Sequence, residues 1–299
     1  MRNHQGTHSD PAPCGPAGRI DGPASRRWLL LRGDALATAR SLRPESIDLV
    51  YADPPFFTGR PRQAAPSARG ANTTGPGTGF DDRWPGGRDQ YIPWLLERVA
   101  AMRDALKPTG SLFLHLDWHA VHPVKVALDG LFGPELFLNE IIWSYRTGGA
   151  GQRRLARKHD TILFYARTRR YKFHALRERS NLAHRYGFAN AGVQTDEQGP
   201  YRLALLRDVW EIPALRGNSP ERVAFPTQKP LALLRRIVAL TTDPGDLVAD
   251  LLCGSGTTVV AAIALDRRAV GADISPAALA LTRRRLAQPG QSAFLLPLQ

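Results

Sequence analysis

The stretch LVADLLCGSGTT at residues 247–258 decides the fold. Its apolar first half is typical of a buried strand, and the small residues 254–256 then turn the chain into a helix that starts at Thr257. Glycines at such a turn let the backbone approach a ligand closely, and the free N–H groups of a helix start favour an anionic group. Asp273 ends the next apolar run 19 residues after Gly254, near the spacing at which a nucleotide-binding sheet presents a carboxylate to ribose hydroxyls. The stretch therefore predicts a strand, a turn and a helix that together bind an adenosyl-type ligand.

Apolar strands and amphipathic helices alternate on both sides of this stretch. The sequence predicts seven strands, at residues 28–31, 47–52, 111–117, 140–145, 161–166, 247–253 and 269–273. It predicts a short helix ending at residue 42 and further helices at 91–106, 119–131, 231–240, 257–265 and 276–286. This alternation indicates an open, mostly parallel α/β sheet. Residues 1–25 are expected to be a disordered tail, and the Gly/Pro-rich residues 59–79 a functional loop such as a lid.

The composition is that of a basic globular protein. Of the 299 residues, 43% are hydrophobic and 22% charged, with a net charge of +13, which excludes a mainly disordered or fibrous protein. Cys14 and Cys253 do not make a disulfide framework or a Cys/His metal site, so a reducing compartment is expected. No apolar run precedes Trp28, and the most apolar stretch, 247–265, contains Asp250 and turn residues. We therefore expect neither a secretory signal nor a membrane span, and a soluble cytoplasmic, nucleoid-associated protein.

The positive charge is concentrated in one block. Residues 146–185 hold twelve lysines and arginines against two acidic residues, a net charge of +10, with aromatic residues interleaved. This mixture is typical of surfaces that contact phosphates and stack on bases. The alternative is a solvated surface in an Arg-rich protein, since arginine outnumbers lysine throughout the chain. We favour nucleic acid as the partner.

A second turn, at Asp53-Pro54-Pro55-Phe56, follows the predicted strand 47–52 and can carry chemistry. Alone, it could be no more than a rigid turn. Together with the glycine turn and the basic block, it indicates methyl transfer to the exocyclic amine of a base. That amine is a poor nucleophile, and N–H bonds accepted by the Asp53 carboxylate and the Pro54 carbonyl would favour a more tetrahedral, reactive nitrogen. Phe56 is expected to stack on the base after it has left the duplex.

With these turns in place, the chain resembles the amino-methylating DNA methyltransferases of the β arrangement, in which the catalytic motif precedes the cofactor motif. The resemblance covers nearly everything from residue 27 to residue 287. Besides the two turns, it is carried by the segments 33–34, 106–112, 115–117, 131–133, 139–143, 159–165 and 226–230. Two departures stand in the cofactor half, where Leu251-Leu252 replace the usual Pro-Phe and Asp273 replaces a commoner Glu.

The resemblance implies a Rossmann-like, seven-stranded methyltransferase sheet that uses S-adenosyl-L-methionine. Residues 26–145 would form the catalytic half, 146–226 an inserted target-recognition region, and 227–299 the cofactor-binding half. Asp34 would lie near the adenine of the cofactor, Asp250 near its amino group, Asp273 near its ribose, and Lys229 near its carboxylate. The complete cofactor-binding set is expected to be Asp34, Lys229, Asp250, Cys253, Gly254, Ser255, Gly256, Thr257, Thr258 and Asp273.

We interpret the protein as a site-specific methyltransferase of double-stranded DNA that modifies adenine N6. Adenine is favoured over cytosine N4 because similar cytosine enzymes more often carry Ser or Thr at the position of Asp53. A DNA-binding module that has lost turnover is the alternative from another class, motivated by Leu251-Leu252. A homodimer and a cognate restriction endonuclease are further candidate partners. The residues expected to bind DNA are Arg146, Arg153, Arg154, Arg157, Lys158, Arg169 and Arg170, whereas Trp118 is expected to pack at the edge of the core.

Overall fold

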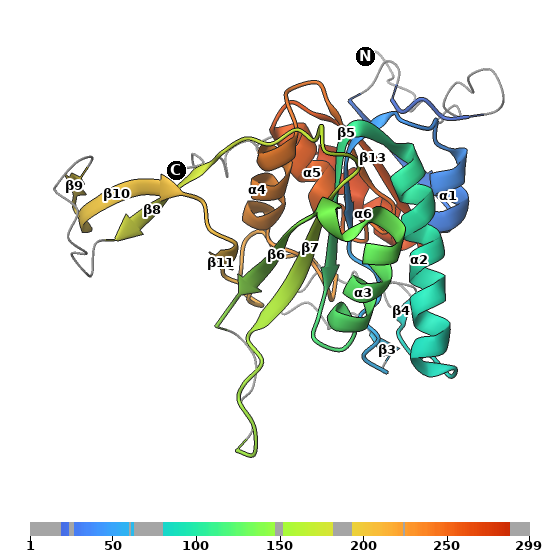
Figure 1. Cartoon of the computed structure of the whole chain (residues 1–299), viewed down its shortest axis with the longest axis horizontal. Helices are drawn as coiled ribbons and strands as arrows, with labels where there is room; N and C mark the ends of the chain where they lie inside the picture. Colours follow the sequence, from blue (N-terminus) through green and yellow to red (C-terminus); the bar gives the residue numbers. More distant parts are fainter. Residues whose placement is uncertain are drawn as a thin grey trace, which may run out of the picture.

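Eight strands form the central sheet of the protein, whose computed structural model is drawn in Figure 1. The structure describes residues 19–23, 27–59, 61–62, 80–146, 152–181, 193–223 and 225–287. The strand order is β1-β13-β12-β2-β5-β7-β6-β11, and neighbours pair in parallel except at β7, which is antiparallel to both β5 and β6. The predicted open, mostly parallel α/β sheet is confirmed.

The described elements follow one another much as the sequence predicts. The strands of the central sheet are β1 (Trp28–Arg32), β2 (Ile47–Ala52), β5 (Leu106–Leu116), β6 (Phe137–Ser144), β7 (His159–Ala166), β11 (Val209–Glu211), β12 (Leu247–Asp250) and β13 (Arg268–Asp273). The helices are α1 (Ala35–Ser41), α2 (Gly87–Ala105), α3 (Val121–Phe132), the 3-10 turn η1 (Pro134–Leu136), α4 (Leu231–Thr241), α5 (Thr257–Ala264) and α6 (Pro276–Ala287). Two small antiparallel sheets join β3 (Pro61–Arg62) to β4 (Phe80–Asp81), and β8 (Arg177–Asn181) to β10 (Gly199–Leu205) and β9 (Gln194–Asp196).

The sheet has one strand more than the seven predicted. The additional strand is β11, which pairs in parallel with β6 at the edge of the sheet. It has three residues, and only the central one, Trp210, is buried. The Trp210 indole donates a hydrogen bond to the Arg207 carbonyl. So short a strand has no apolar periodicity of its own, and it lies in the region that the sequence assigned to target recognition.

Helices cover both faces of the sheet because successive side chains of its buried strands point to opposite faces. In β2, Val50 and Ala52 join the core cluster formed with α1, α2 and α3. Leu49 and Tyr51 join the cluster formed with α4 and α5. Figure 1 shows these two groups of helices on either side of the sheet. Burial on both faces explains why β2 is apolar almost without interruption.

The one charged residue of β2 is neutralised within the sheet. The Asp48 carboxylate accepts hydrogen bonds from the Lys107 ammonium at 2.9 and 2.7 Å and from the Leu247 backbone N–H at 2.9 Å. Asp48 therefore joins β5 and β12 at the amino end of β2, opposite the end that carries Asp53.

The direction of the strands determines where the loops lie. Seven of the eight strands run the same way, so their carboxyl ends share one edge of the sheet, and β7 begins at that edge. We call it the carboxyl edge, and the other one the amino edge. In an open α/β sheet, ligands bind beyond the carboxyl ends of the strands. The loops at the carboxyl edge are therefore where a site is expected.

Several predicted segments fall partly outside the described residues. Of the predicted tail, residues 1–18 and 24–26 lie outside them, while Ile20 exchanges backbone hydrogen bonds with Ser41 and Arg43 next to α1. Of the predicted loop 59–79, residues 60 and 63–79 lie outside, and β3 and β4 pair the two ends. The glycine-rich residues 147–151 also lie outside. No helix in the described part of the chain is both long and apolar enough to span a bilayer.

Candidate active site

The predicted catalytic carboxylate lies at the carboxyl end of β2. Asp53 follows the last residue of this strand and accepts a hydrogen bond from the Lys229 ammonium, with 2.5 Å between Oδ2 and Nζ. Both side chains are largely buried, with 16% of Asp53 and 9% of Lys229 exposed. The prediction that Lys229 lies near the carboxylate of the cofactor stays a prediction, and in the structure its ammonium pairs with Asp53. Among the described residues, no group donates to Oδ1 of Asp53 or to the Pro54 carbonyl.

The segment before α4 holds Lys229 in this position. The Glu221 carboxylate accepts the backbone N–H of Leu231 at 2.7 Å and so caps the start of α4. The Gln228 amide accepts the Val223 N–H at 2.7 Å and donates to the Glu221 carbonyl at 2.9 Å. These bonds join residues 221 and 223 to residues 228 and 231, on either side of Lys229.

The Phe56 ring contacts both the Lys229 ammonium and a buried histidine. The ammonium is 4.8 Å from the centre of the Phe56 ring, and the His115 ring stacks on Phe56 with 5.6 Å between centroids. His115 is completely buried and uses both ring nitrogens, Nδ1 with the Tyr51 hydroxyl at 2.7 Å and Nε2 with the Asp160 carboxylate at 3.3 Å. Because a carboxylate only accepts, Nε2 carries the proton and donates to Asp160. The His115 ring thus supports Phe56.

Asp160 links this network to the start of β7. Burial acts to raise its pKa, but hydrogen bonds from His115 and Tyr145 and the charge of Lys229 lower the pKa below the ordinary value. Tyr145, at the end of β6, donates to Asp160 at 3.0 Å. An ionised Asp160 therefore links the start of β7 to the ends of β5 and β6 through His115 and Tyr145.

A residue that sequence reasoning missed, Asp82, fixes the turn after Phe56. Its carboxylate, 1% exposed, accepts the backbone N–H groups of Phe57 at 2.9 Å and Thr58 at 2.8 Å. It also accepts the Thr58 hydroxyl at 2.6 Å and the Trp84 indole N–H at 3.2 Å. These bonds hold Phe57 at a φ of 61°, a left-handed conformation that is unfavourable for a bulky residue. Asp82 thus keeps the catalytic turn in one conformation.

The glycine turn lies at the end of β12, the neighbour of β2 in the sheet. Gly254 has a φ of 48° and Gly256 a φ of 75°, both in the left-handed region that suits glycine. A Cβ at Gly254 would lie 2.8 Å from the Phe225 ring, and a Cβ at Gly256 would lie 2.2 Å from Cγ2 of Thr282. The turn is therefore tightly covered on both sides. Phe225, from another segment, supplies an aromatic ring at this turn, where Leu252 replaces the usual Phe of the resembling family.

A buried arginine supports the same turn from α6. The Arg285 guanidinium donates to the Ser255 carbonyl at 2.7 Å and to the Thr257 hydroxyl at 3.0 Å. Burial lowers the pKa of Arg285 to about 10, so the side chain stays charged at neutral pH. Thr282, one helical turn earlier, donates to the Gly254 carbonyl at 3.2 Å. No sequence signal pointed to these two residues, because their partners lie about thirty positions away.

Carboxylates end the three strands around the turn. Burial raises the pKa of Asp250 to about 7, although the carboxylate accepts the Thr258 hydroxyl at 2.5 Å and the Leu252 N–H at 3.1 Å. Asp273 accepts the N–H groups of Gly254 at 2.9 Å and Ser275 at 2.8 Å, and burial raises its pKa as well. The chain thereby brings together the predicted cofactor residues of β12, β13 and α5. Burial also raises the pKa of the Cys253 thiol, so this side chain packs beside the turn as a small neutral group.

Asp34 comes two residues after the third of these strands, β1, and caps α1 by accepting the N–H groups of Leu36 and Ala37 at 2.9 and 3.4 Å. Arg98 donates to its second oxygen at 2.8 Å. Partial burial acts to raise the pKa of Asp34, but the bonds from Arg98 and the helix start lower it. Asp34 is thus an ionised carboxylate beside Asp273, whose carbonyl accepts the N–H of Gly33.

The predicted DNA-binding residues do not form one patch. Arg146, Arg153, Arg154, Arg157 and Lys158 lie between the end of β6 and the start of β7, at the carboxyl edge. Arg169 and Arg170 follow the end of β7, and this strand runs antiparallel, so they lie at the amino edge. There, Thr168 donates to the Pro108 carbonyl at 2.6 Å. Figure 1 shows the segment leading into β7 extending away from the sheet.

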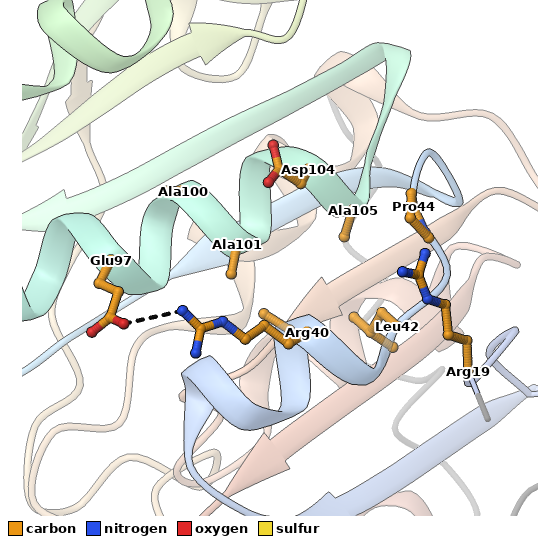
Figure 2. Close-up of a pocket in the computed structure, with 10 residues that line it drawn as sticks. Arg19, Arg40, Leu42, Pro44, Glu97, Ala100, Ala101, Asp104 and Ala105 are labelled. Atoms are coloured by element: carbon orange, nitrogen blue, oxygen red, sulfur yellow. Dashed lines mark hydrogen bonds and ion pairs between the residues drawn. The ribbon is translucent and has the colours of Figure 1, made fainter. Parts of the chain in front are cut away.

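A hollow of about 320 Å³ lies elsewhere, between the ends of α1 and α2. Figure 2 shows Arg40 and Glu97 paired at one side of it and Arg19 at the other. Pro44, which precedes β2, and Ala105, which precedes β5, also line the hollow. It therefore lies toward the amino edge, away from Asp53.

The chain is similar to known DNA methyltransferases. The sequence profile of a family described as DNA methylase, N6_N4_Mtase, matches residues 47–284. DNA adenine methyltransferase YhdJ of Escherichia coli (strain K12) is 29% identical over 263 residues, 86% of this chain and 82% of that protein. Type II methyltransferase M.BglII of Bacillus subtilis is 28% identical over 257 residues, 82% of this chain but only 65% of that protein. The solved PvuII DNA methyltransferase (cytosine-N4-specific) shares the fold, with a TM-score of 0.63 at 18% identity, covering 87% of this chain and 86% of that one.

Proposed function

The chain belongs to the N6/N4 DNA methylase family, and on that premise we propose that it methylates N6 of adenine at a specific site in double-stranded DNA. Membership makes it an S-adenosyl-L-methionine-dependent DNA methyltransferase that modifies an exocyclic amine. Adenine as the base, and the residues that act on it, are what we infer beyond membership. The relative YhdJ, named as an adenine enzyme, supports this choice.

The observation that carries the proposal is how the two carboxylate oxygens of Asp53 are partnered. Lys229 occupies Oδ2 and neutralises the carboxylate, while Oδ1 and the neighbouring Pro54 carbonyl have no donor among the described residues. These two oxygens can accept the two N–H bonds of one amine. Accepting them favours a tetrahedral nitrogen with a localised lone pair, an effect that is strongest in the transition state. Phe56, supported by His115, offers a ring on which the extruded base stacks.

The residues around the glycine turn suit S-adenosyl-L-methionine, which when bound supplies an electrophilic methyl group on a sulfonium. Asp250 and Asp273 end adjacent strands, and Asp34 follows the next strand, β1. Carboxylates favour a cationic amino group and ribose hydroxyls. The Phe225 ring at Gly254 adds an apolar surface for the rest of the molecule. We assign Asp250 to the amino group of the donor and Asp273 to its ribose. A homodimer and a partner endonuclease stay predictions, and the similarity to a type II methyltransferase supports the latter.

The proposal is tested by expressing the chain in a host without DNA methylation and sequencing a resident plasmid by a method that detects modified bases. We expect N6-methyladenine within one short motif and none with Asp53→Ala. Arg268→Ala, which removes an exposed charge at the amino edge, is the matched control and should leave the modification unchanged.

Other outcomes separate the alternatives. N4-methylcytosine would overturn the choice of base and leave the site intact. Unmodified DNA, with S-adenosyl-L-methionine and DNA both bound in vitro, would identify a binding module without turnover. Modification that persists in Asp53→Ala would overturn the role of Asp53.

A further inference from the structure

One aromatic side chain at the carboxyl edge is exposed although the sequence predicted it at the edge of the core. Trp118 follows the end of β5 and is 41% exposed. The Arg157 guanidinium lies 3.3 Å from the centre of its ring, and the His119 ring lies 3.6 Å from the same centre. Two groups so close to one ring centre cannot share a face, so they cover opposite faces of the indole. We call this arrangement the Arg157–Trp118–His119 stack.

The lower half of the stack is fixed to the end of β5. Asp117 accepts the backbone N–H of His119 at 2.9 Å, and its second oxygen lies 2.6 Å from Nδ1 of the His119 ring. Asp117 is itself buried, with 8% of the residue exposed. His119 is thereby oriented, and with it the indole that packs on its ring. The stack is an ordered feature and not a loose surface contact.

The upper half of the stack is an arginine whose polar groups are free. Arg157 is exposed and makes no hydrogen bond or ion pair in the described part of the chain. A guanidinium whose flat face lies on an aromatic ring keeps its N–H groups in its own plane. There they can bind a phosphate bidentately. The indole thus orders Arg157 without using any of its donors.

The stack lies at the carboxyl edge, which also carries the turn with Phe56. In β5, His115 supports Phe56, and Trp118 comes three residues later at the same edge. Arg157 comes two residues before β7, three positions from the Asp160 that bonds His115. The free guanidinium therefore lies at the same edge of the sheet as the turn that is proposed to take up the target base.

We propose that the Arg157–Trp118–His119 stack is a preformed contact for a DNA phosphate next to the target nucleotide, with Trp118 as the residue that positions Arg157. This inference rests on the proposed function. It adds the protein surface that holds the DNA backbone while the target base leaves the duplex. Phosphate contacts fix the register of a protein on DNA, so a pre-ordered arginine favours productive binding. The contact acts on DNA binding and leaves the methyl-transfer step unchanged.

The test is a double-mutant cycle on Trp118→Ala and Arg157→Ala. KM for DNA and kcat are measured on a duplex of about 30 base pairs containing the motif that the plasmid sequencing identifies, and the Kd for the duplex by fluorescence anisotropy. We expect each single variant to raise KM and Kd about tenfold with kcat within about twofold, and the double variant to be no worse than Arg157→Ala. Trp118→Phe, which keeps an aromatic face, should recover most of the affinity. Arg157→Lys, which keeps the charge without the planar stack, should recover only part.

Controls distinguish this inference from the proposed function and from misfolding. Arg268→Ala removes the same charge at the amino edge and should leave KM and Kd unchanged, and thermal unfolding of every variant should match the wild type. Single variants within twofold of the wild type, or effects that add fully in the double variant, would overturn the stack as a DNA contact while wild-type methylation stands. Wild-type protein that neither binds nor methylates the duplex would overturn the proposed function as well.

Discussion

Asp250 is buried, which favours its protonated form, but it should bind its proposed ligand only when it is ionised. The side chain ends β12 and is 3% exposed, and burial raises its pKa to about 7, with the nearby charges of Asp53 and Asp273 acting in the same direction. The proposed partner, the ammonium of the methyl donor, favours the ionised form. Below pH 7 the free protein is mostly protonated at Asp250, and binding must first remove that proton.

The affinity for S-adenosyl-L-methionine should therefore rise with pH. Between pH 6 and pH 8 the ionised fraction of a group with a pKa near 7 grows about tenfold, and we expect the Kd to fall by about this factor. Isothermal titration calorimetry at several pH values measures the change. In Asp250→Asn, binding should be weaker and nearly independent of pH in this range. A wild-type Kd that is constant from pH 6 to pH 8 would contradict the assignment of Asp250.

Substitutions can also test the role of Lys229. Its ammonium, 2.5 Å from Asp53, is the one cation that pairs with this carboxylate among the described residues, and both groups are largely buried. Lys229→Met removes this charge and leaves Asp53 free to turn away. We expect kcat in single-turnover methylation to fall about a hundredfold, the size typical of losing a preorganised electrostatic contact, and Lys229→Arg to retain part of the activity. A variant that changes only the Kd of the methyl donor would show that Lys229 serves the donor and not Asp53.

At the scale of an element, the turn after β2 depends on a residue from the far side of a long connection. Asp82 accepts four hydrogen bonds that hold Phe57 in a left-handed conformation, directly after Phe56. Asp82→Asn replaces one acceptor oxygen by a donor that faces backbone N–H groups, so the turn should lose its fixed shape. We expect kcat to fall about tenfold while the Kd for S-adenosyl-L-methionine stays unchanged, since the site proposed for it lies at the ends of β12 and β13.

Rapid-quench methylation and calorimetry measure these two quantities. Asp89→Asn, an exposed carboxylate in the first turn of α2, is the matched control. If Asp82→Asn does not fold, Thr58→Val removes the hydroxyl bond alone and should lower kcat by a smaller factor. Full activity in both variants would show that the turn keeps its shape without Asp82.

The sequence predicted the elements whose signal is local. β2, the glycine turn and Asp273 are read from apolar runs and small residues that are contiguous in the chain, and each lies where it was expected. The bond between Lys229 and Asp53 joins residues 176 positions apart and depends on the position of α4 relative to β2. No periodicity encodes such a pairing. The contacts of Asp82 could not be predicted for the same reason, because the long connection between β3 and β4 separates Asp82 from Phe57 and Thr58 in the sequence.

At the scale of the molecule, the reversed strand β7 divides the basic block. A sequence treats residues 146–185 as one charged segment, but β7 carries the chain from the carboxyl edge to the amino edge in the middle of it. Five predicted DNA-binding residues therefore lie between β6 and β7 at the carboxyl edge, and two lie at the opposite edge. The net charge of a sequence segment indicates an overall attraction to DNA. It does not indicate which surface of the folded protein contacts the DNA.

This division leads to a prediction for the dependence of DNA binding on salt. If the five basic residues of the carboxyl edge each neutralise one phosphate, the plot of log K against log salt concentration should have a slope of about −4.5, a loss of several hundredfold between 50 and 200 mM. Replacing Arg153 and Arg154 by alanine should make the slope less negative by about two. The same change at Arg169 and Arg170 should alter it far less, because these residues lie at the amino edge. Fluorescence anisotropy with a fixed duplex across the salt series measures each slope. A wild-type slope near zero would contradict the electrostatic basis of binding, and equal changes from the two pairs would mean that DNA contacts both edges of the sheet.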